Sequence, residues 1–180
     1  MSNDAPVEIV PYDVDWPGQF ETERRLLVDA IGRWLVDGSV EHIGSTAVPG
    51  LDAKPVIDIM AGVESLDGSR AALSVLERHQ YCYAQYRTDV MHWLCKPSPA
   101  HRTHHLHLVP RGSHLWIEQL AFRDYLRAHD DVAREYAELK RRLADAHRLD
   151  REAYTSAKAP FVQRVLRDAL RPRSCTDRIC

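Results

Sequence analysis

The chain has 180 residues and a formal net charge of −2, from 24 Lys and Arg against 26 Asp and Glu. This length suits one domain with a single sizeable core, and a hydrophobic fraction of 44% with 28% charged residues excludes extensive disorder. The balanced charge provides no overall attraction to nucleic acid, so we expect no nucleic-acid partner.

The first part of the chain alternates between helical and strand patterns. Asp15 and Pro17 favour a helix that begins near Trp16, with Asp15 as its cap, and apolar residues at helical spacing continue it to a stop at Asp37-Gly38. Runs of apolar and β-branched residues predict strands at about 40–44, 55–61, 81–86, 91–96 and 103–109, with a helix over 69–79.

The last third of the chain is helical. The spacing predicts helices over 115–127, 131–147 and 150–169, and Pro160 should interrupt the last of these. We therefore predict an α+β fold, a mixed sheet with a C-terminal helical layer. No repeat or linker marks a second domain, so we interpret residues 7–170 as one domain and 171–180 as a flexible tail.

Segments that would direct the chain to a membrane or out of the cell are not evident. No apolar run approaches the ~20 residues that a membrane helix needs, and the N-terminus lacks the charged and apolar regions of a signal peptide. The cysteines form no C-x-x-C pair, which favours free thiols in a reducing compartment. The four cysteines are Cys82, Cys95, Cys175 and Cys180. From these features we expect a cytoplasmic protein without a membrane partner.

One carboxylate, Asp58, stands inside the apolar run Pro-Val-Ile-Asp-Ile-Met. Burying an unpaired carboxylate costs several kcal/mol, so Asp58 needs a partner. The preceding loop with Gly44, Ser45 and Thr46, together with Lys54, provides backbone N–H groups, hydroxyls and a cation that can share a bound phosphate or metal. This arrangement indicates nucleotidyl or phosphoryl chemistry, and the alternative is a tight connection capped by its own hydroxyls.

These residues lie in a block, HIGSTAVPGL followed by AKPVIDI, that resembles the signature of the GrpB family, a branch of the nucleotidyltransferase superfamily. Similar blocks, RTHHLHLVPRGS, LAFRDYLRAH, EYAELKRRLA and EAYTSAKAPFV, extend the resemblance over nearly the whole chain. It implies a nucleotidyltransferase-like fold with Gly-Ser at the end of one strand and two carboxylates, two residues apart, on the next. Asp58 matches the first carboxylate, but Met60 stands at the second position, and a thioether is a poor ligand for a hard cation.

Histidines offer replacement ligands. In the strand at 103–109, alternation places His104, Leu106 and Leu108 on one face, which should pack against helices, and His105 and His107 on the other. If this strand lies beside that of Asp58, the three side chains form a two-His, one-carboxylate site for a divalent metal. The alternative is that these imidazoles hydrogen-bond to carboxylates without metal. The candidate catalytic and metal-binding residues are Asp58, His105 and His107.

Further cations fall in family-like blocks on helices. Arg123 and Lys158 are candidate contacts for a triphosphate, and Tyr154 is a candidate for stacking or for donating its hydroxyl; the alternative is a solvated helix face with local ion pairs. Lys140 lies in a helix dense with Arg and Glu, so we interpret it as solvated. The candidate nucleotide-binding residues are Gly44, Ser45, Thr46, Lys54, Arg123, Tyr154 and Lys158.

The leading functional hypothesis is an enzyme, a metal-assisted transferase that uses a nucleoside triphosphate and a small acceptor, with Mg²⁺, Mn²⁺ or Zn²⁺ as cofactor. A second hypothesis is a degenerate fold that binds a nucleotide or a CoA-like phosphate without turnover, which the missing carboxylate at Met60 favours. A third is a scaffold for a partner enzyme, suggested by family members that are fused to dephospho-CoA kinase. The fold by itself cannot choose among them.

Overall fold

A five-stranded mixed sheet forms the centre of the computed structural model, which describes residues 6–171. Its strand order is β1-β2-β5-β4-β3, with β2 and β5 parallel and the other neighbouring pairs antiparallel. The strands are β1 (Leu35–Ile43), β2 (Ile57–Val63), β3 (Cys82–Ala84), β4 (His92–Pro97) and β5 (Arg102–Pro110). This confirms the predicted α+β class with a mixed sheet.

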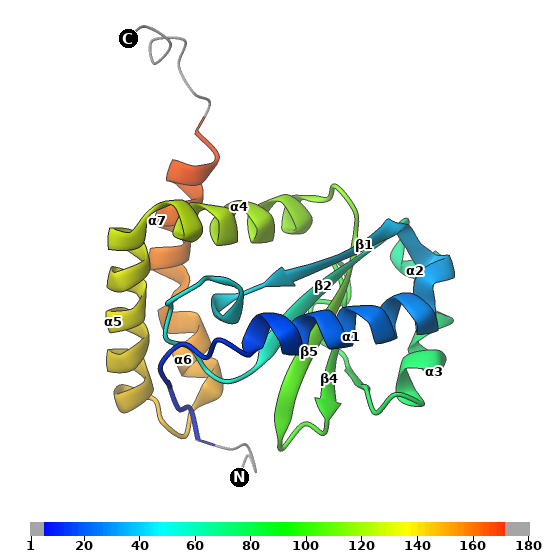
Figure 1. Ribbon diagram of the computed structural model, residues 1–180, viewed down its shortest axis with the longest axis horizontal. Coiled ribbons are helices and arrows are strands. Elements are labelled where there is room, and N and C mark those ends of the chain that lie inside the picture. Colours follow the sequence, from blue (N-terminus) through cyan, green and yellow to red (C-terminus); the bar gives the residue numbers. More distant parts are fainter. Residues whose placement is uncertain (1–5, 172–180) are drawn as a thin grey trace, which may run out of the picture.

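The helices divide between the two faces and one end of the sheet (Figure 1). One face is covered by α1 (Trp16–Ile31) and α3 (Ala72–Glu77), and its core residues include Leu27, Ile59 and Leu106. The C-terminal helices stack beside the sheet, as predicted. They are α4 (His114–Ala128), α5 (Asp130–Ala146), α6 (Arg151–Ala157) and α7 (Ala159–Ala169); short helices η1 (Gly32–Trp34), η2 (Ser45–Ala47) and α2 (Leu66–Ser69) complete the fold.

The opposite face of the sheet carries a smaller apolar cluster, in which Met60 and Val109 pack against Trp116 from α4. A separate cluster between the Val48–Leu51 segment and the helices α4, α5 and α7 joins the helical layer to the loop before β2. Because α4 covers this second face only in part, polar side chains on it can remain accessible. No helix in residues 6–171 is long and apolar enough to span a membrane.

Several predicted boundaries are wrong. The first helix ends at Ile31 and is followed by η1. Asp37 and Gly38, where the helix is expected to end, lie within β1 and adopt positive φ, where the register with β2 shifts between Leu35 and Val40. Within the described residues, Asp15 makes no side-chain cap hydrogen bond. The helix predicted over 69–79 consists of α2 and α3, and the strand predicted over 81–86 contains only Cys82–Ala84.

Other details agree with the sequence. Pro160 separates α6 from α7, where it occupies the first turn and lacks only an N–H that would be unpaired there. Cys82 and Cys95 are free cysteines. The expected flexible tail lies outside the described residues from position 172 onwards, together with Cys175 and Cys180.

Candidate functional site

The site begins with the pairing of two parallel strands. In the β2–β5 register, Asp58 lies opposite His105 and Met60 opposite His107, so all four side chains point to the same face. Leu106 and Ile59 point to the other face, into the core beneath α1. Strand alternation therefore confirms the prediction that His105 and His107 lie on the face of Asp58, away from Leu106 and Leu108.

Asp58 and His105 form a direct hydrogen bond, with 2.8 Å between Asp58 Oδ1 and His105 Nδ1. An ionised carboxylate only accepts hydrogen bonds, so the imidazole carries a proton on Nδ1, and in the neutral ring the lone pair is on Nε2. His105 Nε2 is buried and has no hydrogen-bond partner among the described residues. The pair thus contains a buried imidazole nitrogen that has no hydrogen-bond partner in residues 6–171 and that a ligand can reach only if the side chains covering it move.

The Asp58 carboxylate is held in its ionised form. Burial raises the pKa of Asp58, but the hydrogen bond from His105 and the neighbouring positive charge outweigh it and leave the pKa below the ordinary value. Protein surrounds the group on most sides, yet its side chain keeps 31% of its accessible surface. Solvent or a ligand can therefore reach this carboxylate.

The turn after β1 brings backbone against Asp58. Gly44 has φ +70°, and a Cβ placed on it would lie 2.5 Å from Asp58 Oδ2. Any other residue would be strained at this φ and would collide with the carboxylate. The glycine of the predicted phosphate loop therefore serves a close approach of the turn to Asp58, and Ser45 follows it at the start of η2.

Lys140 is the main site residue that the sequence pattern misassigned. It is 2% exposed, and its Nζ donates to Ser45 Oγ at 2.8 Å and to the carbonyl of Asp52 at 2.5 Å. Desolvation by burial, together with the charge of Lys158, lowers the pKa of Lys140 to about 7. The interpretation as a solvated lysine is wrong because Lys140 shares the buried stripe of α5 with Tyr136 and Ala144, at a spacing of four residues.

Two more lysines, Lys54 and Lys158, lie near the Asp58 carboxylate. Burial, with the charge of Arg151, lowers the pKa of Lys54 to about 8, and burial also lowers the pKa of Lys158 to about 8. The negative charge of Asp58 acts in the opposite direction on both. Within the described part of the chain, neither lysine forms an ion pair with a carboxylate. The Asp58 carboxylate thus acts on all three amines, and Asp52 acts on Lys140 as well, so Lys54, Lys140 and Lys158 outnumber the carboxylates near them.

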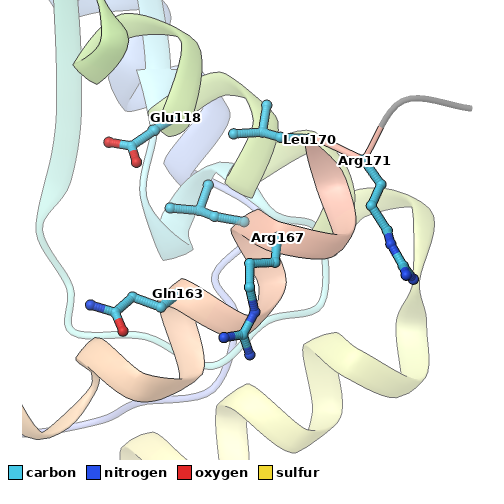
Figure 2. Close-up of a pocket in the computed structure, with 6 residues that line it drawn as sticks. Glu118, Gln163, Arg167, Leu170 and Arg171 are labelled. Carbon is cyan, nitrogen blue, oxygen red and sulfur yellow. The ribbon is translucent and has the colours of Figure 1, made fainter.

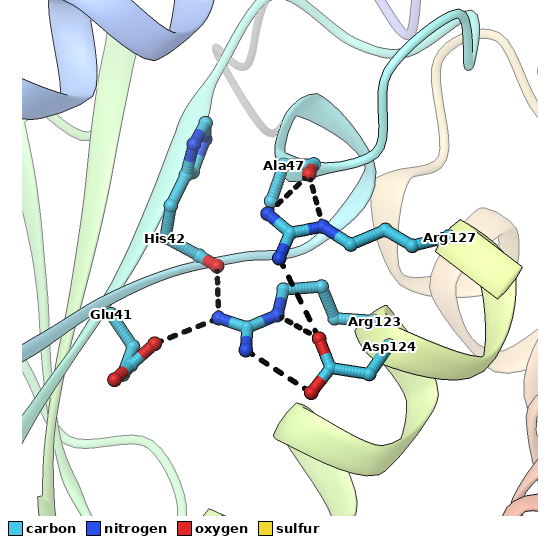
Figure 3. A network of polar contacts seen from close by, with 6 residues as sticks. All are labelled: Glu41, His42, Ala47, Arg123, Asp124 and Arg127. Carbon is cyan, nitrogen blue, oxygen red and sulfur yellow. Dashed lines mark hydrogen bonds and ion pairs between the residues drawn. The ribbon is translucent and has the colours of Figure 1, made fainter.

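Two arginines of α4 hold the turn in place (Figure 3). Arg127 donates to the carbonyl of Ala47 from Nε at 2.9 Å and from Nη2 at 2.7 Å. Arg123 donates to Glu41 Oε2 at 2.8 Å and to the carbonyl of His42 at 3.0 Å, and it also pairs with Asp124. Arg123, a predicted phosphate contact, is therefore engaged by protein groups on both sides of its guanidinium.

The remaining predicted residues have protein surroundings. His107 Nδ1 lies 3.3 Å from Met91 Sδ, and burial lowers the pKa of His107 to about 4, so its imidazole is neutral. Tyr154 is 2% exposed, so its ring cannot stack on a ligand; instead it lies beneath the Lys158 ammonium, 4.3 Å from the ring centroid. Thr46 is buried, with its Oγ1 3.0 Å from His42 Nε2.

Within the described residues, the predicted ligand set of Asp58, His105 and His107 is not arranged as a preformed metal cage. Among residues 6–171, no group of three or more His, Cys, Asp or Glu side chains is arranged to hold a metal ion. Met60 is fully buried in the cluster beneath Trp116. Glu41, the other carboxylate on this face, is paired with Arg123. Asp58 is the acidic side chain that remains available to a cation.

An open groove of about 610 Å³ lies elsewhere, between α4 and α7. Figure 2 shows Glu118 from α4 on one side, and on the other Gln163 and Arg167 from α7 with Leu170, which follows that helix. None of the predicted site residues lines this groove.

The fold and the site define an α+β protein with a lysine-lined polar site on one face of a mixed sheet. A model of the GrpB protein family matches residues 6–168. UPF0157 protein PA4798 of Pseudomonas aeruginosa is 39% identical over 173 residues, which cover 94% of this chain and 70% of that protein. The glutamate-rich protein GrpB of Alkalihalophilus pseudofirmus is 34% identical over 171 residues, which cover 92% of this chain and 97% of that protein.

The crystal structure of the conserved protein GrpB from Enterococcus faecalis matches with a TM-score of 0.81 at 34% identity, and the match covers 90% of this chain and 96% of that chain. The chain belongs to the GrpB family.

Proposed function

We propose that the protein binds the phosphates of a nucleoside triphosphate and transfers a nucleotidyl or phosphoryl group to a small acceptor. The observation that carries this proposal is the cluster of Lys54, Lys140 and Lys158 around Asp58. Lys140 is buried and Lys54 and Lys158 are half-buried, and all three amines have depressed pKa values beside Asp58. This arrangement is unfavourable until an anion joins it. A polyphosphate supplies the missing negative charge.

The turn supplies the second half of the phosphate site. Gly44 allows the backbone to approach closely, and Ser45, whose Oγ accepts a hydrogen bond from Lys140, provides a hydroxyl for a phosphate oxygen. The arginines of α4 fix the carbonyls on both sides of this turn. A pre-positioned turn loses little conformational entropy when a ligand binds.

Asp58 and His105 supply acid–base chemistry. In the proposed step, the side chains that cover His105 Nε2 move aside, an acceptor hydroxyl attacks phosphorus and transfers its proton to this nitrogen, and the bond between phosphorus and the leaving oxygen breaks. The lysines stabilise the negative charge that develops on the leaving phosphate. Asp58 holds the imidazole in the required tautomer and stabilises the imidazolium, which is the role of a carboxylate beside a catalytic histidine.

The resemblance to nucleotidyltransferases adds a divalent cation to this scheme. Mg²⁺ is commonly held by one or two carboxylates together with substrate phosphates, rather than by an all-protein cage. Asp58 fits such a cation, because the hydrogen bond to His105 uses Oδ1 and leaves Oδ2 without a bond to that ring. Since residues 6–171 contain no preformed three-ligand group, the substrate phosphates would complete the coordination. Asp58 would hold the cation, and the cation would supply further charge neutralisation.

Calorimetric titration tests the phosphate site. The protein is titrated with inorganic tripolyphosphate and with ATP, GTP, CTP and UTP, with and without Mg²⁺, in two buffers of different ionisation enthalpy at pH 8. A bound anion raises the depressed lysine pKa values, so binding should take up protons. Affinity should fall from pH 7 to pH 9 as the free lysines lose their charge.

Variants connect the binding to the site. Lys54→Met and Lys158→Met should each weaken tripolyphosphate binding about tenfold or more, while Arg134→Met, which removes an exposed cation from α5, should not change it. Release of pyrophosphate indicates nucleotidyl transfer, whereas release of the nucleoside diphosphate with the phosphate bound to the acceptor indicates phosphoryl transfer. Binding of none of these anions would contradict the proposal, and binding without release under any condition would reduce it to a phosphate-binding module.

A further inference from the structure

Beyond His105, the site continues onto an aromatic surface of β4. Trp93 lies opposite His107 in the β4–β5 register, so its side chain is on the same face of the sheet as Asp58 and His105. The Trp93 and His105 rings are 5.1 Å apart and tilted by 49°. The strand order β1-β2-β5-β4 therefore places His105 between the phosphate cluster and the indole.

The surroundings of Trp93 are polar and accessible. The Tyr86 ring meets it edge-on at 6.4 Å and is itself 52% exposed, and the Arg102 guanidinium lies 5.3 Å from the indole centroid. Arg102 also adds positive charge near Lys54. An apolar ring surface is thus flanked by a phenol and a guanidinium at the open edge of the site.

The geometry of an in-line displacement indicates which substrate group would lie beside Trp93. The attacking and leaving oxygens lie on opposite sides of phosphorus. If the leaving phosphate is held by Lys54, Lys140 and Lys158, the acceptor must approach from the side away from them. His105 lies on that side, with Nε2 buried and without a partner in residues 6–171, and the neighbouring surface in that direction is Trp93.

We infer that Trp93, Tyr86 and Arg102 form the acceptor subsite, and that the acceptor is a sugar hydroxyl. This inference rests on the proposed function. A hydroxyl is a nucleophile that a general base activates by taking its proton. The C–H groups on the flat face of a sugar ring pack favourably on the electron-rich face of an indole. The polar rim of the same ring finds donors in Arg102 and Tyr86. Both a free glycoside and the ribose of a nucleoside have this chemistry.

Nuclear magnetic resonance of the indole N–H groups tests the subsite. The Trp93 signal is assigned from its loss in Trp93→Phe, and the full chain is then titrated with methyl glucoside, with adenosine and with glycerol, an acyclic polyol without a ring face. We expect the Trp93 indole to shift with at least one ring compound and not with glycerol, and the Trp34 indole to stay unchanged. Which ring compound binds separates the two sources of sugar.

Two variants keep the test independent of folding. Tyr86→Ala changes a largely exposed side chain and should weaken ring binding about threefold or more, and Trp93→Leu should weaken it about tenfold or more, whereas tripolyphosphate binding should be unchanged in both. Unaltered ring binding in these variants, equal shifts with glycerol, or no response to any ring compound would overturn the subsite. If the wild-type protein does not bind tripolyphosphate, the proposed phosphate site is overturned instead.

Discussion

Lys140 Nζ donates a 2.8 Å hydrogen bond to Ser45 Oγ, which joins α5 to the turn after β1 across 95 positions of sequence. The same amine donates to the Asp52 carbonyl, so one buried cation fixes both ends of the loop between β1 and β2. Burying an ammonium with only neutral partners is unfavourable, because the charge-assisted hydrogen bonds recover only part of the hydration free energy that is lost. The position of the loop between β1 and β2 therefore depends on the protonation state of Lys140.

Lys140→Met should flatten the rise of stability with pH above neutrality. The pKa of Lys140 is about 7 in the folded chain and near 10.5 when it is unfolded, so between these values the unfolded chain binds more protons. The free energy of unfolding then rises with pH, by up to ~1.4 kcal/mol per pH unit for one such group. Urea unfolding at pH 7, 8 and 9 measures the slope in wild type and variant.

Arg142→Met is the matched control, because Arg142 is an exposed cation on the same helix. It should keep the wild-type slope. Lys54 and Lys158 add to that slope above pH 8, so Lys140→Met should reduce it without removing it. A Lys140→Met slope equal to that of wild type would show that Lys140 does not titrate near neutrality.

His42→Gln should reduce the loss of stability in acid. Burial lowers the pKa of His42 to about 4, below its unfolded value near 6.5, because the ring stacks on Phe20 with centroids 4.6 Å apart and is 7% exposed. The folded chain keeps this imidazole neutral, so its contribution is lost as pH falls from 6.5 towards 4. Thermal unfolding at pH 6.5, 5.5 and 4.5 gives the slope. His101→Gln, at an exposed position in the β4–β5 connection, should leave the slope unchanged.

The parts of the site that follow a rigid period could be predicted from the sequence. Strand alternation placed His105 on the face of Asp58, and the register then made the pair. Arg123 is different, because its contact with Glu41 depends on how α4 crosses the end of β1, 82 positions away, and no local pattern encodes that crossing. The prediction that Lys140 is solvated was wrong for another reason. Its helix contains many charged residues, and these concealed the four-residue spacing of the buried residues Tyr136, Lys140 and Ala144.

Gly44→Ala should destabilise the fold and disrupt phosphate binding. Its Cβ would be placed 2.5 Å from Asp58 Oδ2 at a φ of +70°, so the variant suffers both backbone strain and a clash with the carboxylate. Gly112→Ala has the strain alone, since Gly112 has φ +78° and its new Cβ would meet no described atom within 4 Å. Gly112→Ala should cost about 1 kcal/mol of unfolding free energy and keep full tripolyphosphate affinity. Equal losses in both variants would show that the approach of Gly44 to Asp58 is unimportant.

Asp58→Asn is the most discriminating change, because the carboxylate has two separable roles. The amide keeps the shape and can still accept a hydrogen bond from His105, but the negative charge that balances the lysines is gone. The free energy of unfolding should fall by about 1–3 kcal/mol, less than for a fully buried pair because the Asp58 side chain is 31% exposed.

Binding and turnover should then respond in opposite directions. Without divalent cation, tripolyphosphate should bind Asp58→Asn at least as tightly as wild type, since the site has become more positive. Mg²⁺ should no longer tighten nucleotide binding, and any turnover should fall at least 100-fold, because the imidazolium at His105 loses its counter-charge. Asp52→Asn is the control: it removes a carboxylate near Lys140 without contacting His105, and it should keep turnover. Full turnover in Asp58→Asn would exclude Asp58 from the chemistry, and parallel loss of both activities in Asp52→Asn would mean that the charge balance of the lysines, rather than the Asp58–His105 pair, controls the site.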